Sequence, residues 1–157
     1  MDLIIQNVRL IDGTGAAPVA QVSVEVTGSA ISWIGPESSR PKRTVHQEDI
    51  NGKGLTLIPG IIDCHEHFTG DGGMDAMERL LNDTQEEFTL KAVGNCRRSL
   101  MSGVTTARDV GARFGININI AQQTAAGAVF GPRIIASGEW FQYPGTWPAG
   151  LTRTTET

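Results

Sequence analysis

The sequence predicts an α/β protein whose first part is all-β. Three observations lead to this fold class. Residues 1–58 contain short apolar or alternating runs that are separated by turn sequences. The pattern changes at Pro59-Gly60, and from there strand-like and helix-like segments follow one another in the order β-α-β-α-β. Such alternation implies parallel strands with right-handed helical crossovers, so we expect two parts, residues 1–58 and 59–157.

Five runs of β-branched and apolar residues predict strands in the first part. They lie at residues 3–11, 22–26, 30–34, 44–50 and 55–58. In the second run valine alternates with serine and glutamate, which is typical of a strand with one buried face. Asn51-Gly52-Lys53-Gly54 separates the last two runs and has the composition of a hairpin turn. We therefore expect a small β-meander.

The second part opens with an apolar strand at residues 61–67, of the kind that is covered on both faces. Thr84 then stands three residues before Glu87, as in a capping box at the start of a helix. Apolar residues follow at a spacing of four and define one helix face, and Gly103 is expected to end the helix. These apolar residues are Phe88, Ala92, Cys96 and Leu100.

The remaining segments repeat this alternation. We expect a strand at residues 103–109, a helix at about 117–126 and a third strand at 133–137. Residues 68–83 are expected to be a loop after the first strand. In parallel barrels, such loops shape the substrate pocket.

Composition excludes several classes of function. The formal net charge is -4 and no basic cluster occurs, so we expect no nucleic-acid partner. No apolar stretch reaches the ~20 residues that span a bilayer, so we expect no membrane partner. Two cysteines make no disulfide framework and the N-terminus has no export signal, which favours a cytoplasmic protein. Cys64 and Cys96 lie in apolar patterns and are expected to be buried thiols.

Two of the three histidines, His65 and His67, end the predicted strand at residues 61–67. Successive strand side chains point to opposite faces, so both imidazoles are expected to leave the same face. Two imidazoles arranged in this way can reach one cation at the ~2.0–2.1 Å of zinc–nitrogen bonds. The alternatives are hydrogen-bonded core histidines and an all-β metal site. The place of the pair at the end of an apolar strand favours metal binding.

Three motifs occur in order along the chain. They are LIPGIIDCHEHF at residues 57–68, GVTTARDVG at 103–111 and GPRIIASG at 131–138. Together with the β-rich segment, they make the sequence resemble the amidohydrolase superfamily. Within it, the sequence is most similar to the branch of imidazolonepropionase-like and Xaa-Pro dipeptidase-like enzymes. The resemblance implies the start of a (β/α)8 TIM-like barrel preceded by a small β-sandwich domain.

The resemblance also implies a metal-dependent hydrolase of C–N bonds in amides, peptides or cyclic amides, acting through metal-activated water. It implies one or two zinc ions, or other divalent metals, with His65 and His67 as ligands. The family takes further ligands and its general base from later strands, and no catalytic residue can be assigned here. The third histidine, His46, lies in the β-rich part.

A (β/α)8 barrel takes ~250 residues, and three parallel strands leave an unpaired sheet edge. We therefore expect the site to be completed by the remaining barrel portion or a complementary chain. The lone chain is expected to have little or no activity. A small-molecule or dipeptide-like substrate and a homo-oligomer are expected for the whole enzyme. The alternative is a non-catalytic, truncated chain that acts as an assembly partner.

Other polar and aromatic residues allow two interpretations each. Arg108 and Asp109 either contact substrate or form an ion pair that orders the barrel mouth, and we favour the ion pair. Asp63 shares the predicted face of the histidines and either holds a metal-bound imidazole or makes a polar contact in the barrel. Glu66 is expected to face away. Four aromatic residues line an apolar pocket or pack on the protein: Trp140, Phe141, Tyr143 and Trp147.

Overall fold

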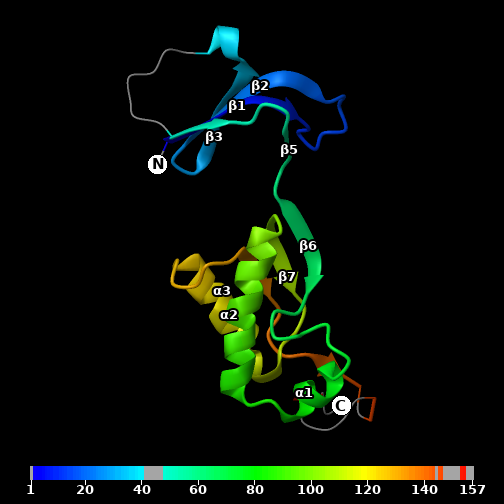
Figure 1. The fold of residues 1–157 in the computed structure, drawn as a ribbon. Coiled ribbons are helices and arrows are strands. Elements are labelled where there is room, and N and C mark those ends of the chain that lie inside the picture. Colours follow the sequence, from blue (N-terminus) through cyan, green and yellow to red (C-terminus); the bar gives the residue numbers. More distant parts are fainter. Residues whose placement is uncertain (1, 41–47, 144, 147–152, 155–157) are drawn as a thin grey trace. The chain divides into compact units, whose positions relative to one another are not determined.

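The computed structural model describes residues 2–40, 48–143, 145–146 and 153–154. The chain divides into two compact units, Met1–Pro59 and Gly60–Thr157. The first unit is a β-sheet, whereas the second combines parallel strands with helices (Figure 1). The α/β class predicted from the sequence is therefore confirmed.

The first unit contains a five-stranded sheet. Its strands are β1 (Asp2–Leu10), β2 (Val19–Thr27), β3 (Ala30–Pro36), β4 (Glu48–Asn51) and β5 (Thr56–Leu57). β1, β2 and β3 are antiparallel neighbours, as a meander requires. A short 3-10 helix, η1 (Glu37–Ser39), follows β3. Val8, Val22 and Val24 form the buried cluster of this unit.

Strand β2 is buried on both faces, although its alternation predicts one buried face. Ser23 and Glu25 are as buried as the neighbouring Val22 and Val24. The Ser23 hydroxyl donates to Glu37 Oε2 at 2.9 Å, and Arg40 Nε lies 3.4 Å from Glu25 Oε1. The polar face is thus covered by partners that the chain supplies after β3, which an alternating pattern cannot reveal.

The predicted hairpin at Asn51-Gly52-Lys53-Gly54 is wrong. β4 and β5 do not pair with each other there. Instead, each pairs in parallel with β1. The amide of Gly52 donates to Gln6 O at 2.8 Å, and Leu55 N donates back to Gly52 O at 2.8 Å. The turn therefore moves the chain from one stretch of β1 to the next without reversing its direction.

The second unit contains a three-stranded parallel sheet in the order β6-β7-β8. Its strands are β6 (Ile61–Glu66), β7 (Val104–Asp109) and β8 (Arg133–Ala136). Two helices connect them, α2 (Gln85–Met101) and α3 (Ile116–Ala125), and a 3-10 turn, η2 (Arg113–Gly115), leads into α3. The β-α-β-α-β order and the parallel pairing agree with the sequence prediction.

Helix α2 begins and ends where the sequence predicts. Thr84 accepts a hydrogen bond from Glu87 N, and the Glu87 side chain accepts one from Thr84 N, which completes the capping box. Phe88, Ala92 and Cys96 are its buried residues. Gly103 follows the helix with a φ of 95°, a conformation that glycine adopts at no steric cost.

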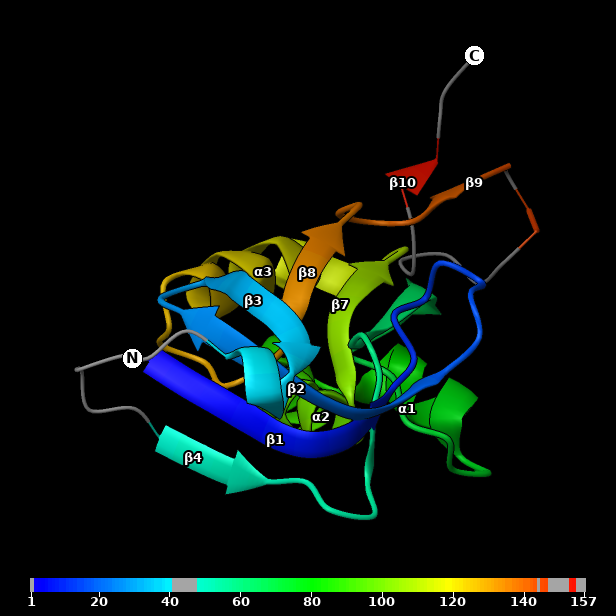
Figure 2. The same cartoon turned by 90° about the horizontal axis from the view of Figure 1, so that it is seen from above.

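Helices α2 and α3 cover one face of the sheet (Figure 2). Ala107 of β7 and Ile134 of β8 pack there against the helix residues. The other face presents Ile62 and Ile135, which are 67% and 59% exposed. The prediction that residues 61–67 are covered on both faces is therefore wrong for this chain, because β6 is an edge strand with one helix layer.

The predicted loop at residues 68–83 contains a helix, α1 (Ala76–Asn82). Its sequence, AMERLLN, consists almost entirely of strong helix formers, which is the signal that could have revealed it. Two short strands near the end of the chain, β9 (Phe141–Gln142) and β10 (Arg153–Thr154), pair in parallel. Within the described part of the chain, no helix is both long and apolar enough to cross a bilayer.

Candidate functional site

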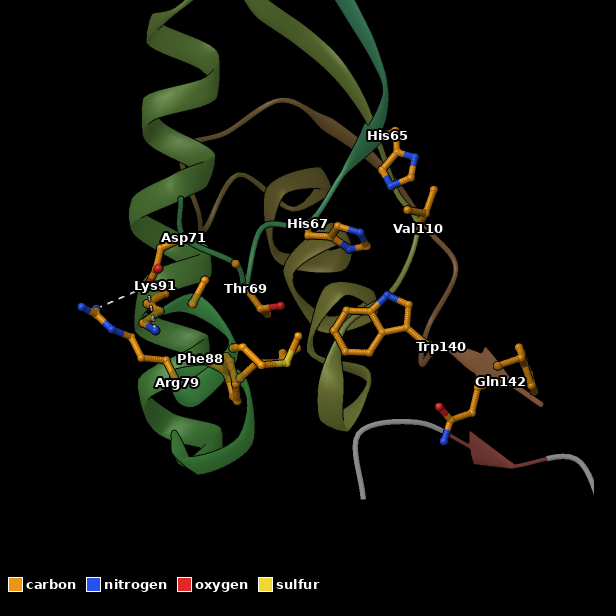
Figure 3. A pocket seen from close by; sticks show the side chains of 15 residues that line it. His65, His67, Thr69, Asp71, Arg79, Phe88, Lys91, Val110, Trp140 and Gln142 are labelled. Carbon is orange, nitrogen blue, oxygen red and sulfur yellow. Dashed lines mark hydrogen bonds and ion pairs between the residues drawn. The ribbon is translucent and has the colours of Figure 1, made fainter. Parts of the chain in front are cut away.

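The two predicted metal ligands lie side by side at the carboxyl end of β6. His65 is near the end of the strand and His67 follows it directly. Their ring centroids are 5.3 Å apart and the ring planes meet at 79°. Both line one cavity of about 510 Å³ (Figure 3). The structure thus places both imidazoles at the same cavity.

A backbone carbonyl holds the ring of His67. Its Nδ1 lies 2.8 Å from the carbonyl oxygen of Gly111. A carbonyl oxygen accepts and cannot donate, so in this contact Nδ1 carries the proton. The neutral ring then keeps its free electron pair on Nε2, which is the atom available to bind a cation. Ring contacts of this kind usually orient metal-ligating histidines.

Gly111 has to be glycine for two reasons. Its φ is 154°, and a Cβ at this position would come within 2.0 Å of Trp140 Cδ1. The indole therefore packs directly on the backbone whose carbonyl holds His67. The Trp140 ring also lies close to the imidazole of His67, with 5.5 Å between centroids. Trp140 forms the cavity wall beside His67 (Figure 3).

The favoured ion pair between Arg108 and Asp109 is wrong. Asp109 is fully buried, whereas Arg108 is exposed on the other face of β7. The partners of Asp109 are neutral donors. Phe68 N donates to its Oδ2 at 3.0 Å, and Gly111 N donates to its Oδ1 at 3.0 Å. Neighbouring residues of a strand point to opposite faces, so the two side chains are held apart.

Asp63 and Glu66 do not line the cavity of about 510 Å³. The register of β6 with β7 shifts between these two residues, so strict alternation stops there. Asp63 pairs with Ala107, which packs under the helices, and accepts a hydrogen bond from His65 N at 2.9 Å. Its contact is with the backbone beside His65. Glu66 likewise accepts from His67 N at 2.9 Å.

The cavity wall opposite Trp140 comes from α1 and α2. The apolar side chains that line the whole cavity include Met77, Leu80, Phe88, Val110, Trp140 and Phe141. The sequence missed the first two because it missed α1. Of the predicted aromatic residues, Trp140 and Phe141 line the cavity, whereas Tyr143 is exposed and does not. Trp147 lies outside the described residues.

The two cationic side chains that line the cavity, Arg79 and Lys91, are paired with aspartates. Arg79 Nη2 lies 2.7 Å from Asp75 Oδ2, and Lys91 Nζ lies 3.1 Å from Asp71 Oδ2. Lys91 also pairs with Asp83. The hydrogen bond from Lys91 holds the pKa of Asp71 below its ordinary value, and that from Arg79 does the same for the pKa of Asp75. Arg79 and Lys91 therefore already form ion pairs within the protein (Figure 3).

Imidazole nitrogens suit zinc, so the pair fits a metal in kind. In number it supplies two ligands, while catalytic zinc sites take three from the protein. Across residues 2–40, 48–143, 145–146 and 153–154, no cluster of three His, Cys, Asp or Glu is arranged to hold a metal. His46 lies outside these ranges. The pair is thus suited to be one part of a metal site.

Comparison with known proteins gives a consistent result. Residues 56–153 match the model of the Amidohydrolase family. The chain is 28% identical to the ochratoxinase of Aspergillus niger over 131 residues, which are 82% of this chain and 26% of that protein. It is 32% identical to an imidazolonepropionase of Cereibacter sphaeroides over 111 residues, which are 68% of this chain and 26% of the relative. The chain thus spans about a quarter of the length of these curated relatives.

Solved structures share the fold. A Xaa-Pro dipeptidase with bound methionine in its active site superposes with a TM-score of 0.76 at 26% identity, over 90% of this chain and 34% of that one. The Aspergillus niger ochratoxinase superposes with a TM-score of 0.78 at 22% identity, over 99% of this chain and 41% of that one.

Proposed function

This chain belongs to the amidohydrolase family, and we propose that it forms part of a metal-dependent enzyme that hydrolyses C–N bonds. His65 and His67 are the proposed metal ligands. One observation carries this assignment. The two imidazoles share a cavity wall, and the contact of His67 Nδ1 with the Gly111 carbonyl leaves its Nε2 available.

The residues of this chain have three tasks in that reaction. His65 and His67 hold the metal, which, when bound, supplies a Lewis acid that lowers the pKa of water toward neutrality. Gly111 orients the ring of His67. Trp140 packs against that ring and excludes water from one side of the site, which strengthens electrostatic interactions there.

We further propose that residues 59–157 form the first β/α units of a (β/α)8 barrel and that residues 1–58 are part of a β-sandwich. The parallel order β6-β7-β8 supports the barrel, since helical crossovers lie on one face of the sheet only. In such barrels the active site gathers at the carboxyl ends of the strands, where the two histidines lie. The missing ligands and the general base then come from the remaining barrel portion.

The cavity favours a substrate with an apolar group next to the scissile bond. Its walls are mostly apolar, and its cations are already paired with aspartates. The names of the relatives, among them an N-acyl-D-aspartate deacylase and a Xaa-Pro dipeptidase, fit a substrate of amino-acid or dipeptide size. We therefore propose an amide or dipeptide whose apolar side packs against Trp140 and Phe88.

Zinc binding tests the assignment of the ligands. The chain is titrated with zinc against a weak chelator, as wild type and as His65→Ala, His67→Ala and His46→Ala. We expect each of the first two substitutions to weaken binding by more than about tenfold, because each removes half of the pair. His46→Ala is the matched control and should leave binding unchanged. Equal affinity in all four proteins would contradict the metal site.

Complementation tests catalysis. The chain is mixed with a fragment that carries the remaining barrel strands, and hydrolysis of N-acyl amino acids and dipeptides is followed. We expect activity from the mixture and almost none from the lone chain. Strong hydrolysis by the lone chain would contradict the proposal that the active site is shared with the remaining barrel portion. A mixture that assembles but stays inactive favours the second candidate, a non-catalytic assembly partner, which the uncovered face of the sheet also supports.

A further inference from the structure

We propose that Asp109 is a positioning residue that sets the orientation and the protonated nitrogen of the His67 ring. This inference rests on the proposed role of His67 in metal binding. Asp109 does not line the cavity and has no contact with it. It acts through the backbone on both sides of His67, and no charged partner competes for its side chain among the contacts that the structure describes.

The side-chain oxygens of Asp109 accept three hydrogen bonds in a fully buried position. Oδ2 accepts from Phe68 N at 3.0 Å. Oδ1 accepts from Gly111 N at 3.0 Å and from Asn117 Nδ2 at 2.9 Å. The side chain is 0% exposed, so water cannot replace any of these acceptors. Leaving a buried N–H without an acceptor is costly, which holds the arrangement in place.

Two of these three donors flank His67. Phe68 is the next residue along the chain, so its amide fixes the backbone from which the imidazole extends. Gly111 is the residue whose carbonyl holds His67 Nδ1 at 2.8 Å. One carboxyl group therefore ties the backbone that carries the ring to the backbone that orients the ring. The segments lie 44 residues apart in sequence, and the Asp109 side chain bridges them.

The third donor fixes Asp109 itself. Asn117, buried on α3, donates to Asp109 Oδ1 and also to Gly138 O at 3.0 Å. Gly138 O accepts in addition from Ala112 N at 3.0 Å. The carbonyl of Gly138, just after β8, thus accepts from Asn117 at the start of α3 and from Ala112 just after β7. This leaves the Asp109 side chain little freedom to rotate away from Phe68 and Gly111.

A purely structural role predicts a different outcome. If Asp109 only stabilised the fold, its loss would disturb both histidines alike. His65, however, has its backbone contact with Asp63 and none with Asp109. Removal of Asp109 should therefore release His67 while leaving His65 as it is. The contrast between the two rings separates positioning from general stability.

The test uses Asp109→Asn in the full chain. The asparagine has the same shape, but its NH2 group replaces one of the two acceptor oxygens. It must then face N–H donors, either that of Phe68 or those of Gly111 and Asn117. Long-range ¹⁵N–¹H NMR of the metal-free chain reports which ring nitrogen of each histidine carries the proton. We expect His67 to change from one form to a mixture and His65 to stay unchanged. Zinc affinity should fall by about 10- to 100-fold.

Two further variants keep the test decisive. Arg108→Ala, one residue away but on the exposed face, should change neither His67 nor zinc affinity. Asn117→Ala removes one of the three donors and should give a smaller change of the same kind at His67, which decides the matter if Asp109→Asn does not fold. A folded Asp109→Asn, or otherwise a folded Asn117→Ala, with an unaltered His67 spectrum overturns the proposal. Failure of the wild type to bind zinc refutes the proposed function instead, since the spectra are recorded without metal.

Discussion

The two faces of the β6-β7-β8 sheet differ in what covers them. On the helix face, Ala107 is fully buried against α2 and α3. On the other face, Ile62 pairs with Thr106 and Arg108 pairs with Ile135, and the side chains of Ile62, Arg108 and Ile135 are exposed. Both faces carry aliphatic side chains, so the apolar character of a residue does not determine its burial here.

This difference indicates which contacts stabilise the second unit. The helix face is closed by crossovers that directly connect consecutive strands, so the contacts form between segments close in sequence. The uncovered face needs partners from farther away, as the interior of a barrel does. The histidine pair lies at the end of the sheet, and of the two rings it is that of His67 whose surroundings are tied to the closed face through Asp109 and Asn117.

The two cysteines provide the largest expected contrast. Cys96 lies on the buried face of α2, and burial raises the pKa of its thiol from its ordinary value of 9.0 to about 12. Cys64 on β6 is exposed, which corrects the expectation that both are buried. At pH 8, the thiolate fraction of Cys96 falls roughly a thousandfold from its ordinary value. We expect a thiol reagent to label Cys64 and spare Cys96, as read by mass spectrometry.

Equal labelling of the two thiols in the folded chain would show that the buried face of α2 is accessible to the reagent. Labelling in denaturant is the control, and there both thiols should react.

Matched isoleucine truncations sharpen the comparison. Ile116→Ala empties a site on α3 that is 2% exposed and should cost about 2–5 kcal/mol of unfolding free energy. Ile135→Ala removes the same atoms from the uncovered face and should stay within about 0.5 kcal/mol. Urea unfolding, followed by circular dichroism, measures both. A loss at Ile135 as large as that at Ile116 would mean that the second face is covered in solution, for instance by another copy of the chain.

The smallest expected effect concerns the start of the helix that covers the sheet. Thr84→Ala breaks the capping box of α2 and should cost about 0.5–2 kcal/mol. Thr84→Ser keeps the hydroxyl and serves as the control, with nearly wild-type stability. Thermal unfolding compares the two. If alanine and serine behave alike, tertiary packing alone positions α2, and the capping hydrogen bonds add nothing measurable.

Local patterns predicted the second unit well where the signal lies within a few residues. The Thr84–Glu87 box and the spacing of Phe88, Ala92 and Cys96 were enough to place α2. The common side of His65 and His67 was predicted because alternation along a strand is also local, and both side chains line the same cavity, while their role as metal ligands stays a prediction. Helix α1 was missed although its residues have high helix propensity, because the glycines that precede it suggested a loop.

Long-range pairing could not be predicted in the same way. The turn at Asn51-Gly52 is compatible with a hairpin, and only the packing of β4 and β5 along β1 rejects it. The partner of Asp109 was assigned to its neighbour Arg108, whereas two of its three donors, Phe68 and Asn117, come from other segments of the chain.

The sequence by itself determined the alternation of strands and helices, the ends of α2 and the place of the two histidines at the end of an apolar strand. Each of these follows from hydrogen bonding and side-chain direction within a short stretch of backbone. Only the tertiary structure decided which nitrogen of His67 is free and why position 111 must be glycine. The first depends on His67 and Gly111, which are 44 residues apart, and the second on the contact of position 111 with Trp140, so only the tertiary packing brings these groups together.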